Sequence, residues 1–133
     1  MKKALYVFFS LMAVCFMITV SQVNVSASGI MPRYEIADVI RTVLTVNNNQ
    51  ANCSVMVMGK SETARISGTI KLYDDTARET VKTWSISTAN TYYTFNKNVA
   101  VTSGHTYTLS FSGYLYNGDG DSEYVYGSDS ATN

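Results

Sequence analysis

Apolar and polar residues alternate over residues 103–116, S-G-H-T-Y-T-L-S-F-S-G-Y-L-Y, in the longest such run of the chain. Because successive side chains of a β-strand point to opposite faces, this pattern predicts a central strand with one buried and one solvated face. The buried face is expected to carry His105, Tyr107, Leu109, Phe111 and Leu115, and the solvated face Thr106, Thr108, Ser110, Ser112, Tyr114 and Tyr116.

Shorter segments repeat the period of two and are bounded by polar or glycine-containing turns. They cover residues 51–58, 65–73, 81–86, 92–101 and 123–126. Residues 34–46 fit a helix as well, since Ile36, Val39, Ile40, Val43 and Leu44 have helical spacing. We favour a strand there, because the segment is rich in β-branched residues and three asparagines turn it directly into the next strand.

Together these segments predict an all-β fold, an antiparallel Greek-key sandwich of about seven strands with immunoglobulin-like architecture. The domain is expected to span residues 34–127, and the polar residues 128–133 to form a frayed tail.

The N-terminus has the organisation of a secretory signal peptide. Lys2 and Lys3 precede an apolar run over residues 4–20, and V-S-A before Ser28 places small residues at a cleavage site. We expect cleavage after Ala27, a secreted product without membrane attachment, and a short arm over residues 28–33. The alternative is an uncleaved anchor, because the run approaches the minimum of about 17 residues that can span a bilayer.

Charge narrows the range of partners. The chain has ten basic and ten acidic residues, and loss of Lys2 and Lys3 leaves eight against ten, a net charge of −2. Nucleic acids and anionic membranes are bound by clustered Lys and Arg, so neither is expected as a partner. After cleavage Cys53 is the one cysteine left, and its apolar strand predicts a buried thiol, with an intermolecular bridge as the alternative.

The S-G-H-T-Y run resembles the start of strand F in immunoglobulin-like and fibronectin type III domains. The resemblance implies that Gly104 is the turn glycine and that Tyr107 is a corner tyrosine bonded to upstream backbone. It also implies that Leu109 and Cys53 occupy the two places of the antibody disulfide and pack by apolar contact. Trp84 falls one strand later than the immunoglobulin core tryptophan, so the likeness covers architecture.

The chain from residue 28 onward also resembles a group of small secreted proteins of Gram-positive, largely gut-dwelling bacteria. The shared residues are Ala51, Cys53, Gly59, the strand from Ile66 to Leu72, V-K-T-W ending at Trp84, and G-H-T-Y ending at Tyr107. This resemblance implies export and a β-sandwich domain, and it brings no functional residue with it.

No motif of a hydrolase or zinc protease accompanies His105, the single histidine. The acids Asp74, Asp75 and Glu79 lie in one polar loop and are expected to be solvated. We therefore expect no catalysis and no cofactor.

The stretch N-G-D-G-D-S-E over residues 117–123 alternates oxygen ligands with glycines, as a loop around a hard cation does. It predicts a weak calcium site with Asn117, Asp119, Asp121 and Glu123 as ligands. Asn-Gly and Asp-Gly are also common hairpin turns, which makes a plain tip loop the alternative.

Four of the ten tyrosines flank this loop: Tyr114, Tyr116, Tyr124 and Tyr126. If seven residues connect the two strands that carry these tyrosines, Tyr116 pairs with Tyr124 and all four rings form one surface. If six residues connect them, Tyr116 faces Glu123 and the tyrosines are divided between the two faces of the sheet. One surface of amphipathic rings suits a sugar or a protein partner, while cross-strand rings also simply stabilise a sheet.

The sequence thus predicts an extracellular binding module for a glycan or a cell-surface protein. One alternative is an assembly protein that self-associates through an edge strand or Cys53. Another is a bacteriocin-like or toxin-like effector. The oligomeric state does not follow from the sequence.

Overall fold

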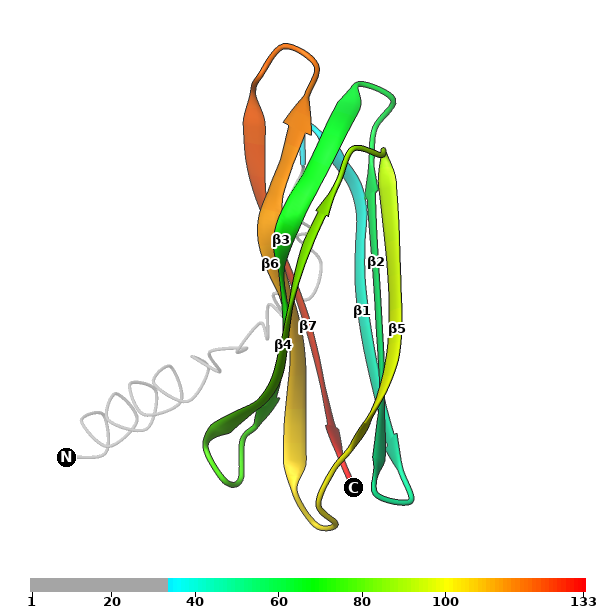
Figure 1. Ribbon diagram of the computed structural model, residues 1–133, viewed down its shortest axis with the longest axis vertical. Helices are drawn as coiled ribbons and strands as arrows, with labels where there is room; N and C mark the ends of the chain where they lie inside the picture. The colour runs from blue at the N-terminus through cyan, green and yellow to red at the C-terminus, as the bar shows by residue number, and fades with distance from the viewer. Residues whose placement is uncertain (1–33) are drawn as a thin grey trace, which may run out of the picture. The chain divides into compact units, whose positions relative to one another are not determined.

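Seven antiparallel strands make up residues 34–133, the part of the chain that the computed structural model describes (Figure 1). The signal peptide expected over residues 1–27 and the arm expected over 28–33 lie outside it. The strands are β1 (Ala37–Asn47), β2 (Gln50–Gly59), β3 (Thr63–Asp74), β4 (Glu79–Thr88), β5 (Tyr92–Ala100), β6 (Thr106–Asn117) and β7 (Ser122–Thr132). The ambiguous segment is therefore strand β1. No helix of this part of the chain is long and apolar enough to cross a membrane.

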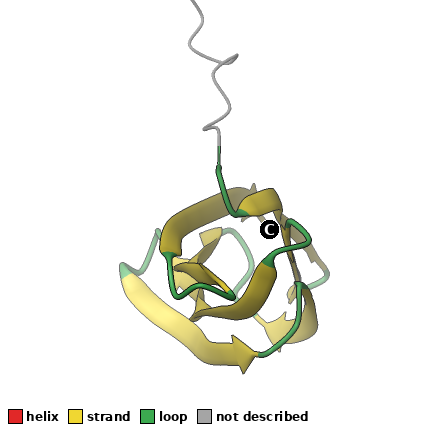
Figure 2. Cartoon of the chain, turned by 90° about the horizontal axis from the view of Figure 1, so that it is seen from above, coloured by secondary structure: helices red, strands yellow, loops and turns green. Residues whose placement is uncertain are grey.

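The strands form two sheets, with the orders β1-β2-β5 and β4-β3-β6-β7. Figure 1 shows the two sheets in separate layers, and the view from above in Figure 2 shows the strands around a shared interior. This arrangement confirms the all-β sandwich. β6 lies between β3 and β7, so the long alternating run forms an interior strand, as predicted.

The interior consists of the inward-facing residues of both sheets. β6 supplies Tyr107, Leu109, Phe111 and Leu115, each at most 1% exposed, and β2 supplies Ala51, Cys53, Val55 and Val57. The period-two pattern of the sequence therefore separates the core from the surface correctly on both strands.

The expectation of a frayed tail after residue 127 is wrong. β7 continues to Thr132 and pairs with β6 as far as Thr106. The C-terminal half of β7, residues 127–132, reads G-S-D-S-A-T and is poor in the β-branched and aromatic residues that are typical of a strand. The local sequence therefore does not predict a strand there. The strand forms because β6 offers it a partner along its whole length.

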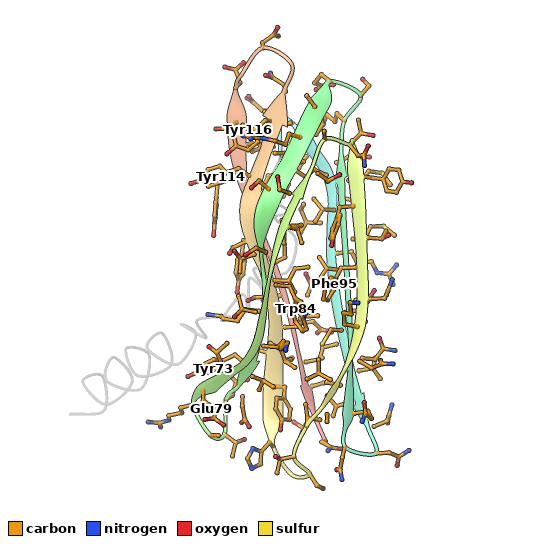
Figure 3. The ribbon with its side chains drawn as sticks, viewed as in Figure 1. Tyr73, Glu79, Trp84, Phe95, Tyr114 and Tyr116 are labelled. Atoms are coloured by element: carbon orange, nitrogen blue, oxygen red, sulfur yellow. The ribbon has the colours of Figure 1, made fainter. Side chains whose placement is uncertain are left out.

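The two sheets meet closely where β1 and β7 lie side by side. Backbone pairing does not join these two edge strands; instead, carboxylates of β7 accept backbone N–H groups of the segment that leads into and forms β1. A Cβ atom on Gly127 would come within 2.9 Å of side-chain atoms of Ile40 and Thr42, so glycine permits this approach. The other pair of edges, β4 and β5, is bridged by an edge-to-face contact between Trp84 and Phe95, with ring centroids 4.9 Å apart (Figure 3).

Candidate functional site

The hairpin between β6 and β7 has a register that neither sequence-based alternative predicted. Tyr116 pairs with Ser122, so five residues connect the strands, rather than six or seven. Tyr114 lies opposite Tyr124, and Ser112 lies opposite Tyr126. Because five is odd, as seven is, the four tyrosines still share one face of the sheet.

We call Tyr114, Tyr116, Tyr124 and Tyr126 the tyrosine surface. The ring centroid of Tyr114 lies 5.4 Å from that of Tyr124 and 6.3 Å from that of Tyr116. Tyr114, Tyr124 and Tyr126 are 45%, 54% and 51% exposed. Figure 3 shows Tyr114 and Tyr116 on the outer side of the hairpin, away from the other sheet.

Arg65 of β3 extends this surface. It lies opposite Tyr116 in the sheet, and its guanidinium carbon is 4.0 Å from the centre of the Tyr116 ring. The sequence does not connect Arg65 with the tyrosines, because the pairing of β3 with β6 joins segments far apart in the chain. The contact orients the cation by attraction to the face of the ring.

The structure does not arrange the four calcium candidates as a set of ligands, because side-chain oxygens of Asn117, Asp121 and Glu123 are used in hydrogen bonds within the protein. Asn117 Oδ1 accepts the N–H groups of Asp119 and Asp121 at 3.1 and 2.9 Å, and Asn117 Nδ2 donates to Asp121 Oδ2 at 3.2 Å. Both carboxylate oxygens of Glu123 accept backbone N–H groups of residues 35–37. Among residues 34–133, no group of three or more His, Cys, Asp or Glu side chains is placed to hold a metal ion. The alternative, a plain tip loop, describes this hairpin better.

Both oxygens of Glu123 are occupied by backbone donors. Oε1 accepts the N–H of Glu35 at 2.7 Å, and Oε2 accepts those of Ile36 and Ala37 at 2.8 Å each. Burial raises the pKa of Glu123, but these N–H groups and Lys60 lower it, and the net result is a pKa below the ordinary value. Glu123 therefore fixes the start of β1. It also lines an open depression of about 360 Å³ with Glu35, Glu62 and Asp121.

The residues predicted to be structural occupy the predicted roles where the structure tests them. The hydroxyl of Tyr107 accepts the Thr102 N–H at 2.8 Å and donates to the Thr102 carbonyl at 3.2 Å, which is the expected corner contact. Gly104 has a φ of 79°, a left-handed turn conformation that favours glycine.

Cys53 is a buried free thiol, as predicted. It and Leu109 are both 0% exposed and belong to the same core cluster. Burial raises the pKa of the Cys53 thiol to about 11, so the reactive thiolate is scarce at neutral pH. These properties are those of a packing residue.

The expectation that Asp74 is solvated is wrong, because this residue is 4% exposed and is the carboxylate partner of His105. Nδ1 of His105 lies 2.7 Å from Oδ2 of Asp74, whose Oδ1 accepts the N–H groups of Thr76 and Ala77. Burial raises the pKa of Asp74, whereas Ala77, His105 and Thr76 lower it, and the pKa is lowered overall. No hydroxyl or thiol of residues 34–133 hydrogen-bonds to the other ring nitrogen of His105, so the pair links the β3–β4 turn to the start of β6.

A second exposed surface lies on the other sheet. Val39, Met58 and Tyr92 form one row across β1, β2 and β5, and Met56 lies in the next row. Their exposed fractions range from 36% to 60%. Tyr92, the most exposed of them, provides a control residue for the tyrosine surface.

The fold and this site define a small two-sheet β-sandwich with tyrosines gathered on one outer face. No model of a known protein family matches the chain, and no curated protein matches it significantly.

Proposed function

We propose that the protein is a secreted, non-catalytic binding module whose tyrosine surface engages a glycan or a cell-surface protein. The observation that carries the proposal is the exposure of these rings: Tyr114, Tyr124 and Tyr126 are about half exposed, although the core does not require them. Tyrosine provides apolar area and a hydroxyl at a low entropic cost, which is why it is enriched in binding surfaces.

Sheet stabilisation alone is a weaker explanation of this cluster. The pair of Tyr114 and Tyr124 stabilises the hairpin by about 0.2–1 kcal/mol, as cross-strand aromatic pairs do. Such a pair does not require the further rings of Tyr116 and Tyr126 on the same face. It also does not require the cation of Arg65 held against the cluster.

The observations favour binding over the two alternatives. Assembly through Cys53 would require a thiol that is accessible, and this one is 0% exposed. The edge strands β4 and β5 carry lysines, Lys82 and Lys97, at core-facing register positions, a placement that discourages pairing between sheet edges. No feature of the described residues favours a toxin-like effector.

We also propose that the domain is immunoglobulin-like or fibronectin type III-like, and that the protein belongs with small secreted proteins of Gram-positive gut bacteria. The corner contact of Tyr107 and the division into three and four strands support the first part. The residues shared with that group support the second, and most of them lie in the core or in turns.

The double variant Tyr114→Ala/Tyr124→Ala tests the function. Binding to a glycan array, and capture of surface proteins from bacterial cells, should weaken at least about tenfold, because central aromatic residues dominate such interfaces. Tyr92→Ala, on the opposite sheet, is the matched control and should bind as the unchanged protein does. Equal binding by all three proteins would remove the tyrosine surface as the site.

A further inference from the structure

The outward side of the four-stranded sheet is polar well beyond the tyrosine surface. Its register positions carry many hydroxyl side chains, among them Ser67, Thr69, Ser85, Ser112 and Ser128. No aspartate or glutamate occupies an outward register position of β3, β6 or β7. This is notable in a chain whose residues 28–133 contain more acids than bases.

One carboxylate reaches the end of this face from the β3–β4 turn, where Asp75 accepts a hydrogen bond from Thr108 at 2.6 Å. Two cations stand on the face, and each lies against a tyrosine. Arg65 lies over the Tyr116 ring, and Lys71 Nζ is 5.8 Å from the centre of the Tyr73 ring. Within residues 34–133 the one ion pair shorter than 4.0 Å joins His105 and Asp74, so neither cation is paired with a carboxylate there. Six residues along β3 separate them by about 20 Å.

We propose that this face binds an acidic polysaccharide whose carboxylates are carried on its sugar rings. The inference rests on the proposed function and names the ligand class of the same site. Sugar rings stack on Tyr114 and Tyr124, carboxylates reach Arg65 and Lys71, and the hydroxyl side chains between them bond to the sugar hydroxyls. The charge is complementary at Arg65 and Lys71, which are not paired with a carboxylate, while Asp75, at the end of the face, is hydrogen-bonded to Thr108.

The position of Arg65 selects among anionic polymers. Its guanidinium lies against the tyrosine surface itself, so a sugar stacked on Tyr114 brings a ring-borne carboxylate within reach of Arg65. The planar fork of arginine binds a carboxylate through two parallel hydrogen bonds. A polymer with its charge in phosphodiester linkers would place the anion between the sugars, away from the stacked ring.

Binding of polygalacturonate and of the same polymer with its carboxyl groups reduced, measured by calorimetry, tests the inference. The purified protein should prefer the acidic polymer by at least about tenfold, the effect of one or two charge-assisted hydrogen bonds. Arg65→Gln and Lys71→Gln should each weaken it about fivefold, and the double variant about 25-fold, because sites this far apart act independently. Lys97→Gln, with the same charge change on the other sheet, should have no effect.

The outcomes separate this inference from the proposed function. The carboxylate inference is overturned if the acidic and reduced polymers bind equally, or if glycosylated poly(glycerol phosphate) alone binds. In either case the proposed function stands if Tyr114→Ala/Tyr124→Ala still abolishes binding. Tyrosine-dependent capture of a surface protein without polysaccharide binding likewise overturns this inference alone. Polygalacturonate binding that survives loss of both tyrosines contradicts both proposals. Thermal melts of every variant establish that folding is unchanged.

Discussion

Tyr107 shows how one buried polar atom connects sequence to fold. Its ring is 1% exposed in the core, while its hydroxyl makes two hydrogen bonds to the backbone of Thr102. The segment from Thr102 to Tyr107 connects β5 of one sheet to β6 of the other. A side chain that is both core and hydrogen-bond partner therefore fixes the path of the chain between the two layers.

Tyr107→Phe should lower the free energy of unfolding by about 1 kcal/mol, the net value of such hydrogen bonds. The loss stays moderate because Thr102 is exposed and water can replace the hydroxyl. For a domain of this size, the melting temperature should fall by about 4–8 °C. Tyr92→Phe removes a hydroxyl from an exposed ring and should leave the melting temperature unchanged. Equal melting of all three proteins would show that the corner contact contributes nothing.

At the scale of the strands, the sequence predicts those features that local patterns determine. Alternation identifies the inward residues of β6, from Tyr107 to Leu115, because the side-chain period of a strand is local. It also predicts that the four tyrosines share a face whenever an odd number of residues connects β6 and β7. The number itself, five, follows from the bonds of the Asn117 side chain to the loop backbone, which composition does not reveal.

The β1–β7 contact shows what local patterns miss. Glu123 and Asp129 are separated by more than 80 residues from the backbone groups they bind, and in the sequence they read as ordinary polar residues of a hairpin and a tail. For the same reason the sequence predicts a calcium site that includes Glu123. Only the packing of the two sheets turns these carboxylates inward toward β1.

Acid should expose the contribution of Glu123 to stability. Its pKa is lowered in the folded protein, so its contribution is complete above the ordinary value of 4.5 and is lost as the pH falls through the lowered value. Stability should therefore be level from about pH 7 to pH 5 and should fall below that, as carboxylates bonded in the native state are protonated. Urea unfolding at a series of pH values measures this dependence.

Glu123→Gln should remove much of this acid dependence, leaving the part that Asp74 contributes through its own lowered pKa. At pH 7 it should cost about 2 kcal/mol, because hydrogen bonds to a charged acceptor are lost. Hydrogen exchange should accelerate at the amides of Glu35, Ile36 and Ala37. Glu62→Gln, at an exposed position, is the control. If the stability of the Glu123 variant falls below pH 5 as steeply as that of the unchanged protein, the role of this carboxylate is contradicted.

For the whole molecule, hydrogen bonds join one pair of sheet edges, whereas the other pair meets through the ring contact of Trp84 with Phe95 and leaves its edge backbone open. β1 and β7 are joined by the carboxylates of β7, whereas β4 and β5 present unpaired backbone at the opposite side. Lys97 lies opposite Cys53, and Lys82 lies opposite Leu72, so both lysines occupy core-facing register positions of their strands. Both side chains are nevertheless exposed. An incoming strand would have to bury these charges, which is costly.

Lys82→Val/Lys97→Val should therefore make the protein self-associate through its open edges. Light scattering after size-exclusion chromatography should give a monomer mass for the unchanged protein, which is 14.6 kDa for the full chain and less if the N-terminal segment is removed. The variant should give the mass of dimers or larger species. Lys71→Val is the control, because it makes the same lysine-to-valine change on an interior strand and should remain a monomer. A variant that remains monomeric would show that the lysines do not guard the edges. Association of the unchanged protein, insensitive to reductant, would instead favour assembly over binding as the role of this sandwich.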